Sequence, residues 1–126
     1  MSKILFIDDE REFVIVIGNR YRQILGLRDF TVEEYTVINN DPQVDIARSY
    51  NQAVELFSNN TYDMVFFDHD LGEEKNGMDI AKWVSSNITV PFLFYVHSAN
   101  PAGRINIMSY IQQYFNHLSA KDCPHA

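Results

Sequence analysis

The sequence predicts an α/β fold with a mainly parallel sheet, because short apolar runs alternate with helical patterns along the chain. Three of these runs end directly on polar residues: Lys3 to Ile7, Met64 to Phe67 and Phe92 to Val96. Continuous apolar runs are typical of strands that are buried on both faces. We therefore expect three layers, in which right-handed helical crossovers cover both faces of one sheet.

The composition indicates a single domain with a substantial core, since 46% of the 126 residues are hydrophobic. The formal net charge of −7 argues against an extended nucleic acid as a partner, because binding its phosphates requires clustered Lys and Arg. A small phosphate ligand is compatible with this charge if a metal ion or a local arginine offsets the acids.

The sequence also bears on the compartment. Cys123 is the only cysteine, so the chain cannot form an internal disulfide. No run approaches the roughly 18 apolar residues of a membrane span, and the start lacks a signal-peptide pattern. We therefore expect a cytoplasmic protein that does not bind a membrane. A homo-oligomer is compatible with the sequence.

The first strand, Lys3 to Ile7, should lead into a helix from about Arg11 to Gly26, where the glycine ends it. The helix is favoured by four residues at helical spacing, Ile17, Tyr21, Ile24 and Leu25. The β-branched segment Phe13 to Ile17 would also suit a strand.

The segment Phe30 to Ile38 has two interpretations. Thr31 and Glu34 have the spacing of a capping box that opens a helix, whereas Tyr35 to Ile38 prefers a strand. Asn39 to Pro42 is a turn.

Alternating strands and helices continue in the second half. A strand is expected over Val44 to Ala47, and Ser49 can cap the helix that follows. The apolar face of that helix carries Ala53, Val54, Leu56 and Phe57. The strand Met64 to Phe67 precedes a helix over Gly77 to Val84, whose apolar positions are Met78, Ala81 and Val84.

The last helix should follow the strand Phe92 to Val96. Asn100 is its candidate N-cap, and Pro101 suits the first helical position, where its missing N–H is not needed. Its predicted buried stripe comprises Ile105, Met108, Ile111 and Phe115.

Ionisable residues follow three of the expected strands. Asp8 and Asp9 come after the first strand, the trio Asp68 to Asp70 after the central one, and His97 after the fourth. Because carboxylates rarely cluster without a partner and parallel strands end at one edge of a sheet, we expect a ligand site at this edge.

Asp8 and Asp9, Asp68, and Ser98 after the fourth strand resemble the receiver domains of two-component signalling. That resemblance implies acids that hold Mg²⁺ and an aspartate, Asp68, that accepts a phosphoryl group. The Lys-Pro that ends the fifth strand of receivers has no counterpart here, so we expect no fifth strand.

A wider pattern is similar to the cyclic-phosphate-processing receiver domains. It comprises Asp8-Asp-Glu-Arg11, Phe67-Asp-His-Asp-Leu-Gly72, Asn76-Gly77 before Lys82-Trp83, and His97-Ser-Ala-Asn-Pro-Ala-Gly-Arg104. The resemblance implies a receiver-like, flavodoxin-like domain over residues 1–118, followed by a polar tail over 119–126. It also implies action on cyclic phosphates in phage or bacterial conflict systems.

Asp8, Asp9, Asp68 and Asp70 offer the oxygen ligands that Mg²⁺ or Mn²⁺ prefers. The plain alternative is that these acids are solvated in loops.

His69 and His97 can transfer protons at neutral pH, so with Asp68 they are the candidate catalytic residues. They could instead complete a transition-metal site or simply hold a loop.

Ser98, Asn100 and Arg104 lie where the fourth strand turns into the last helix, whose first N–H groups can cradle a phosphate. Arg11 is a further candidate phosphate contact. The alternatives are helix capping by Asn100 and salt bridges of the arginines, with Glu10 or Asp70 as partners of Arg11.

The sequence hypothesis is therefore a metal-assisted phosphoesterase or binding protein for a cyclic-phosphate nucleotide or RNA end. One alternative is a signalling module phosphorylated on Asp68. Another is a binder of a nucleotide or partner without catalysis.

Overall fold

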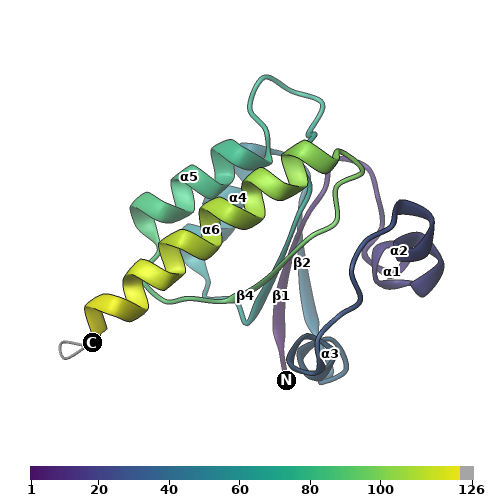
Figure 1. The fold of residues 1–126 in the computed structure, drawn as a ribbon, viewed down its shortest axis with the longest axis horizontal. Coiled ribbons are helices and arrows are strands. Elements are labelled where there is room, and N and C mark those ends of the chain that lie inside the picture. The colour runs from purple at the N-terminus through teal and green to yellow at the C-terminus, as the bar shows by residue number, and fades with distance from the viewer. Residues whose placement is uncertain (123–126) are drawn as a thin grey trace.

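A four-stranded parallel sheet lies at the centre of the computed structural model, which describes residues 1–122 (Figure 1). Its strands are β1 (Lys3–Ile7), β2 (Gln43–Ala47), β3 (Met64–Phe67) and β4 (Leu93–Val96), and they lie in the order β2-β1-β3-β4. The predicted α/β fold is thereby confirmed, and residues 1–122 form no fifth strand.

Helices cover both faces of the sheet, as Figure 1 shows. One face carries α1 (Phe13–Ile17), α2 (Asn19–Leu25) and α3 (Val32–Ile38). The other carries α4 (Tyr50–Asn59), α5 (Gly77–Asn87) and α6 (Pro101–Asp122).

The core is divided by the alternation of side chains along the strands. Ile4 and Phe6 of β1 pack with Phe66 of β3 beneath α1 to α3. Their neighbours Leu5 and Ile7 pack in the opposite core, beneath α4 to α6. Both sets are fully buried, which is why the central strands read as continuous apolar runs in the sequence.

The helix predicted from Arg11 to Gly26 is divided into α1 and α2. Gly18 between them is extended, with φ −66° and ψ 136°, and this conformation interrupts the helix. The strand alternative for Phe13–Ile17 is wrong, and Ile24 is 71% exposed rather than on a buried face. Gly26 ends α2 in the left-handed conformation, as predicted.

The two interpretations of the segment Phe30 to Ile38 are resolved in favour of a helix. Thr31 and Glu34 form both bonds of the capping box. The buried Glu34 carboxylate also pairs with Arg28 through two N–H···O contacts of 2.7 and 2.8 Å. Local capping therefore outweighs the strand preference of the β-branched residues.

The last helix, α6, begins where it was predicted, but its buried face differs from the prediction. Ile105 is 60% exposed, and Ile107 takes its place beside Ile111 and Phe115, at intervals of four residues. The helix continues to Asp122, past the predicted domain end at 118. The rest of the predicted tail, with Cys123, lies outside the described residues.

None of the helices within residues 1–122 has the length and apolar character that crossing a bilayer requires.

Gly77 fixes the position of α5 against the end of β3. Its N–H donates to the carbonyl of His69 at 2.8 Å. A Cβ at this position would overlap the carbonyl oxygen of Asp68 and lie 3.0 Å from the Cα of His69. These neighbours are backbone atoms, so they cannot move aside independently.

We expect the Gly77→Ala substitution to destabilise the fold by about 2 to 3 kcal/mol, because α5 must shift away from β3. Urea unfolding followed by circular dichroism measures this free energy. Ser86→Ala, at an exposed position of the same helix, should change it by no more than about 0.5 kcal/mol. Equal stability of the Gly77→Ala variant and the unmodified chain would contradict the assignment.

Candidate functional site

Three ionisable residues continue one row of side chains past the end of the sheet. Phe6 pairs with Phe66, and Phe66 pairs with Tyr95. Two positions further along β1, β3 and β4 are Asp8, Asp68 and His97. Because side chains alternate along strands, these three project from the same face as the phenylalanines.

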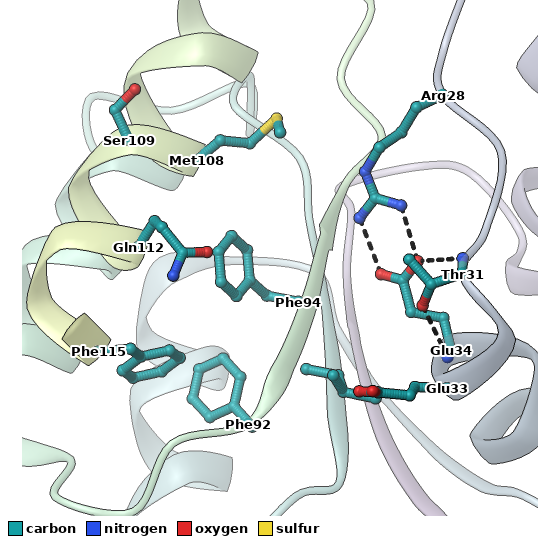
Figure 2. Close-up of a pocket in the computed structure, with 11 residues that line it drawn as sticks. Arg28, Thr31, Glu33, Glu34, Phe92, Phe94, Met108, Ser109, Gln112 and Phe115 are labelled. Carbon is teal, nitrogen blue, oxygen red and sulfur yellow. Dashed lines mark hydrogen bonds and ion pairs between the residues drawn. The ribbon is translucent and has the colours of Figure 1, made fainter. Parts of the chain in front are cut away.

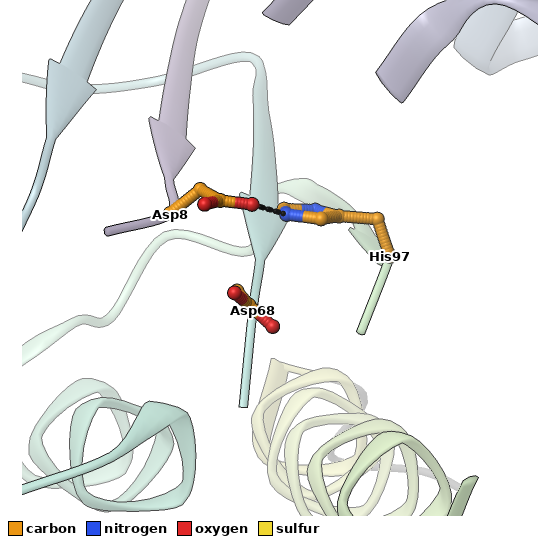
Figure 3. Close-up of side chains that lie close together, drawn as sticks. All are labelled: Asp8, Asp68 and His97. Atoms are coloured by element: carbon orange, nitrogen blue, oxygen red, sulfur yellow. Dashed lines mark hydrogen bonds and ion pairs between the residues drawn. The ribbon is translucent and has the colours of Figure 1, made fainter. Parts of the chain in front are cut away.

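Backbone hydrogen bonds hold this row in register beyond the strands. The N–H of Asp68 donates to Ile7 at 3.0 Å, and the N–H of His97 donates to Phe67 at 3.0 Å. The structure therefore brings together one predicted residue from each strand end (Figure 3).

The three side chains form a buried cluster. Asp8 and His97 have no exposed surface, and Asp68 is 1% exposed. Each offers one oxygen or nitrogen atom, and these atoms lie within 4.8 Å of one another. Buried charge of this kind requires hydrogen bonds or a cation.

Asp8 meets this requirement with hydrogen bonds from other protein groups. Its Oδ1 accepts the N–H groups of Glu10 and Arg11 at 2.9 and 2.8 Å, and its Oδ2 lies 2.9 Å from Nε2 of His97. Burial alone would raise the pKa of Asp8, but these bonds outweigh it and lower the pKa to about 2. Asp8 is therefore ionised throughout the physiological range.

His97 donates to Asp8 from Nε2, since an ionised carboxylate only accepts. Its ring stacks on Phe6 with centroids 5.0 Å apart, and its carbonyl accepts the hydroxyl of Tyr21 at 3.1 Å. The other ring nitrogen, Nδ1, is buried and has no hydrogen-bond partner. His97 is thus enclosed behind the carboxylates.

The buried charge of Asp68 is less well compensated than that of Asp8. Burial raises its pKa, as does the charge of Asp8, while His97 and Arg11 oppose the increase. Its Oδ2 is buried without a hydrogen bond. The nearest cation is Arg11, whose Nη1 lies 3.5 Å from Asp68 Oδ2 and 3.6 Å from Asp8 Oδ2. Arg11 thus pairs with Asp8 and Asp68, not with Glu10 or Asp70 as considered from the sequence.

A hollow of about 230 Å³ opens above Asp68. Arg11 and Ser98 line it, and so do Asp9 and Asp70, which are outside the buried cluster. The predicted acids are therefore divided between a buried pair, Asp8 and Asp68, and two residues of the hollow wall.

His69 lies apart from His97, against the start of α6. Its Nδ1 is 3.0 Å from Oδ1 of Asp70 and 3.5 Å from Nδ2 of Asn100. A Cβ on Gly103 would overlap the His69 ring, so the glycine permits this close packing. The two predicted catalytic histidines are thus in separate environments.

The loop between β4 and α6 uses its polar side chains for local bonds. Ser98 Oγ accepts the N–H of Asn100 at 3.1 Å, and Asn100 Oδ1 accepts the N–H of Gly103 at 3.0 Å. Arg104 donates to the carbonyl of Ser98 at 2.9 Å. Asn100 therefore has the capping role that was the alternative to phosphate binding, whereas Arg104 bonds a loop carbonyl instead of the neighbouring acid considered from the sequence.

A larger hollow of about 650 Å³ lies elsewhere, beside the free edge of β4 (Figure 2). Phe92 and Phe94 form part of its apolar wall. On the opposite wall, Arg28 and Glu34 already neutralise each other. The other ionisable residue of the lining is the exposed Glu33, whose carboxylate would repel a phosphate, so the walls of this hollow do not favour an anionic ligand.

Sequence reasoning missed the support that Tyr21 and Arg48 give to the site. The hydroxyl of Tyr21 donates to the carbonyl of His97, and the centre of its ring lies 5.9 Å from the Arg11 guanidinium. Arg48 donates to the carbonyls of Asp8 and Arg11, at 3.2 and 2.6 Å. Both residues reach the site from distant elements, so no local pattern identifies them.

We expect Gly103→Ala to destabilise the chain by about 1 to 3 kcal/mol through its overlap with the His69 ring. At an unhindered helical position the same change stabilises by about 0.5 to 1 kcal/mol. In a His69→Ala background the cost should therefore vanish, which urea unfolding of the four-member mutant cycle measures. Additive effects of the two substitutions would show that the glycine does not pack on His69.

The fold has been seen in solved receiver structures. The receiver domain of a putative Luxo repressor protein from Vibrio parahaemolyticus is similar over 99% of this chain and 98% of its own, with a TM-score of 0.57 and 10% identity. The response regulator TrrA from Thermotoga maritima, solved with Mg²⁺ and BeF, is 18% identical, with a TM-score of 0.53. This match covers 88% of the chain and 81% of TrrA.

A fusion containing a yeast Spc42 trimeric coiled-coil segment is also similar, with 24% identity and a TM-score of 0.52. The match covers 86% of this chain and 63% of that one. No curated protein matches the sequence.

The family comparison is more specific. A model described as the cyclic-phosphate processing receiver domain matches residues 3–113, which include every residue of the buried cluster and of the hollow. The chain therefore belongs to the cyclic-phosphate processing receiver domain family.

Proposed function

We propose that the chain hydrolyses the cyclic phosphate of a small nucleotide or of an RNA end, bound in the hollow above Asp68. The observation that carries this proposal is the buried Asp68 Oδ2, which has no hydrogen bond and lies beside the partly exposed Arg11. Membership of the cyclic-phosphate processing family supports the substrate class.

Arg11 is the proposed phosphate contact. Its side chain is 33% exposed and lines the hollow, so its outer N–H groups can reach a ligand. A guanidinium binds phosphate oxygens in pairs and stays charged at any physiological pH. The same cation also offsets the repulsion between Asp8 and Asp68.

Asp8 and Asp68 are suited to hold a divalent cation such as Mg²⁺ or Mn²⁺, because their carboxylates converge and one oxygen has no hydrogen-bond partner. When bound, such an ion supplies Lewis-acid polarisation of a phosphoryl oxygen. Asp9 and Asp70 on the wall of the hollow would orient ligand or water.

His69 is the proposed general acid. Its side chain is 18% exposed, and Asp70 orients it through the 3.0 Å contact to Nδ1. In the proposed reaction, water attacks phosphorus and passes a proton to Asp68, the ring P–O bond breaks, and His69 protonates the departing sugar oxygen. His97, enclosed behind the carboxylates, positions Asp8 instead of touching substrate.

Incubation with cyclic mononucleotides, cyclic oligonucleotides and cyclic-ended RNA, with Mg²⁺ or Mn²⁺, tests the proposal directly. We expect ring opening to a phosphomonoester or linear product, detected by phosphorus NMR and chromatography. Absence of turnover across this panel would remove the enzymatic claim and leave binding alone.

We expect His69→Ala to lower kcat about 100-fold, since general acid catalysis contributes at least this factor. Arg11→Ala should mainly raise KM, because it removes a phosphate contact. His117→Ala, at an exposed position of α6, is the matched control and should leave both constants unchanged. If His69→Ala and His117→Ala have the same activity, His69 has no catalytic role.

A second candidate function is a signalling module that is phosphorylated on Asp68, favoured by the position of this residue at the end of β3 and by the likeness to receivers. No lysine lines the hollow, so the positive charge there comes from Arg11. We expect acetyl phosphate to leave the mass of the chain unchanged and beryllofluoride to leave its amide NMR spectrum unshifted. An adduct on Asp68 would favour signalling over hydrolysis.

A further inference from the structure

His97 differs from the oxygen donors beside it, and its nitrogen changes which ion the cluster should prefer. Asp8 and Asp68 contribute carboxylate oxygens, and His97 contributes an imidazole nitrogen, all within 4.8 Å of one another. Imidazole together with carboxylates is a donor set of zinc and related ions. Magnesium prefers oxygen ligands, so a nitrogen donor in the cluster favours a transition ion over it.

We propose that Asp8, Asp68 and His97 form a three-residue site for a first-row transition ion such as Zn²⁺, with His97 as an inner ligand. This rests on the proposed function only for the place of the cation, at the base of the same hollow. It assigns His97 a role in binding the ion, in place of the proton transfer considered from the sequence.

The Asp68 Oδ2 atom, which has an ion-pair contact with Arg11 at 3.5 Å but no hydrogen bond, is an independent indication of a cation site. Buried carboxylate oxygens are nearly always hydrogen-bonded, and an unpaired one is costly. Figure 3 shows the Asp68 carboxylate close to the Asp8–His97 pair, with no dashed contact to either. An ion between the three side chains would give this oxygen a direct ligand bond.

The hydrogen bonding of His97 is compatible with binding an ion. Nε2 now donates its proton to Asp8, and Nδ1 has no partner. Moving the proton from Nε2 to Nδ1 frees the Nε2 lone pair and breaks only the bond to Asp8. One hydrogen bond is thus exchanged for one metal–ligand bond.

Arg11 occupies the approach to these carboxylates. Its Nη1 lies 3.5 and 3.6 Å from the Oδ2 atoms of Asp68 and Asp8, so it provides the positive charge when no ion is bound. A dication at the same carboxylates would repel the guanidinium towards the hollow, where phosphate is expected. Arginine and ion therefore compete for the acids, and the ion makes the arginine available to the ligand.

Isothermal titration with Zn²⁺, Co²⁺ and Mg²⁺, together with the visible spectrum of the Co²⁺ form, tests the site without substrate. We expect one Zn²⁺ or Co²⁺ per chain, bound at least about 100-fold more tightly than Mg²⁺. The Co²⁺ spectrum should show the intense visible bands of a low-coordinate site. Equal affinities for Zn²⁺ and Mg²⁺, or a spectrum like that of aqueous Co²⁺, would overturn the proposal.

Variants identify the ligands. His97→Gln keeps a donor for Asp8 and a similar volume, so circular dichroism should confirm its fold, and its Zn²⁺ affinity should fall about 100-fold. His117→Ala, at an exposed position of α6, is the histidine control and should bind Zn²⁺ as the unmodified chain does. Arg11→Ala should bind Zn²⁺ about 10-fold more tightly. Unchanged affinity of a folded His97→Gln variant would exclude His97 as a ligand.

The outcomes also separate this inference from the proposed function. Tight, His97-dependent Zn²⁺ binding without turnover of any cyclic phosphate would remove the enzymatic proposal and keep the metal site. Turnover with Mg²⁺ that persists in His97→Gln, without selective Zn²⁺ binding, would keep the enzyme and remove the metal site.

Discussion

The parallel register of β1, β3 and β4 is the constraint on which the site depends. It carries Asp8, Asp68 and His97 past the last strand pairs in one row and on one face. A slip of one residue in β3 would turn Asp68 towards α5 and α6 and break the cluster. The fully buried apolar residues of both central strands prevent such a slip, because it would exchange the two core faces. The packing that fixes the strand register therefore also fixes the geometry of the site.

Burying three ionisable side chains costs free energy on folding. The protein offsets this cost more fully at Asp8 than at Asp68. Asp8 receives two backbone N–H groups and His97, whereas Oδ2 of Asp68 has an ion-pair contact with Arg11 at 3.5 Å and no hydrogen bond. A cluster built only for stability would satisfy both carboxylates or replace them with apolar groups. Asp68 also lines the hollow, which is consistent with a ligand or ion completing the contacts of its carboxylate.

The sequence was sufficient for the sheet and for the row of strand-end residues, because apolar runs and the polar residues that end them are local signals. It was insufficient where tertiary packing determines the helix boundaries and the buried faces. The break at Gly18 and the exposed Ile105 follow from how the helices meet the sheet, and helical spacing alone suggested otherwise.

The environments of the site residues also could not be predicted. His69 and His97 have similar positions after their strands, yet His69 packs on Gly103 and His97 packs on Phe6. The Asp68 partner of Arg11 and the support from Arg48 come from segments distant in sequence, so no spacing rule identifies them.

The central claim is that the strand-end cluster, and not the larger hollow at the edge of β4, is where a phosphate is bound. A crystal structure of the chain with a cyclic mononucleotide tests this most directly. The account predicts the phosphate within hydrogen-bond distance of the Arg11 guanidinium and next to Asp68, with the base extending towards Asp70 and Ala99. A nucleotide seated instead between Arg28 and Phe94, with the strand-end hollow unchanged, would contradict it.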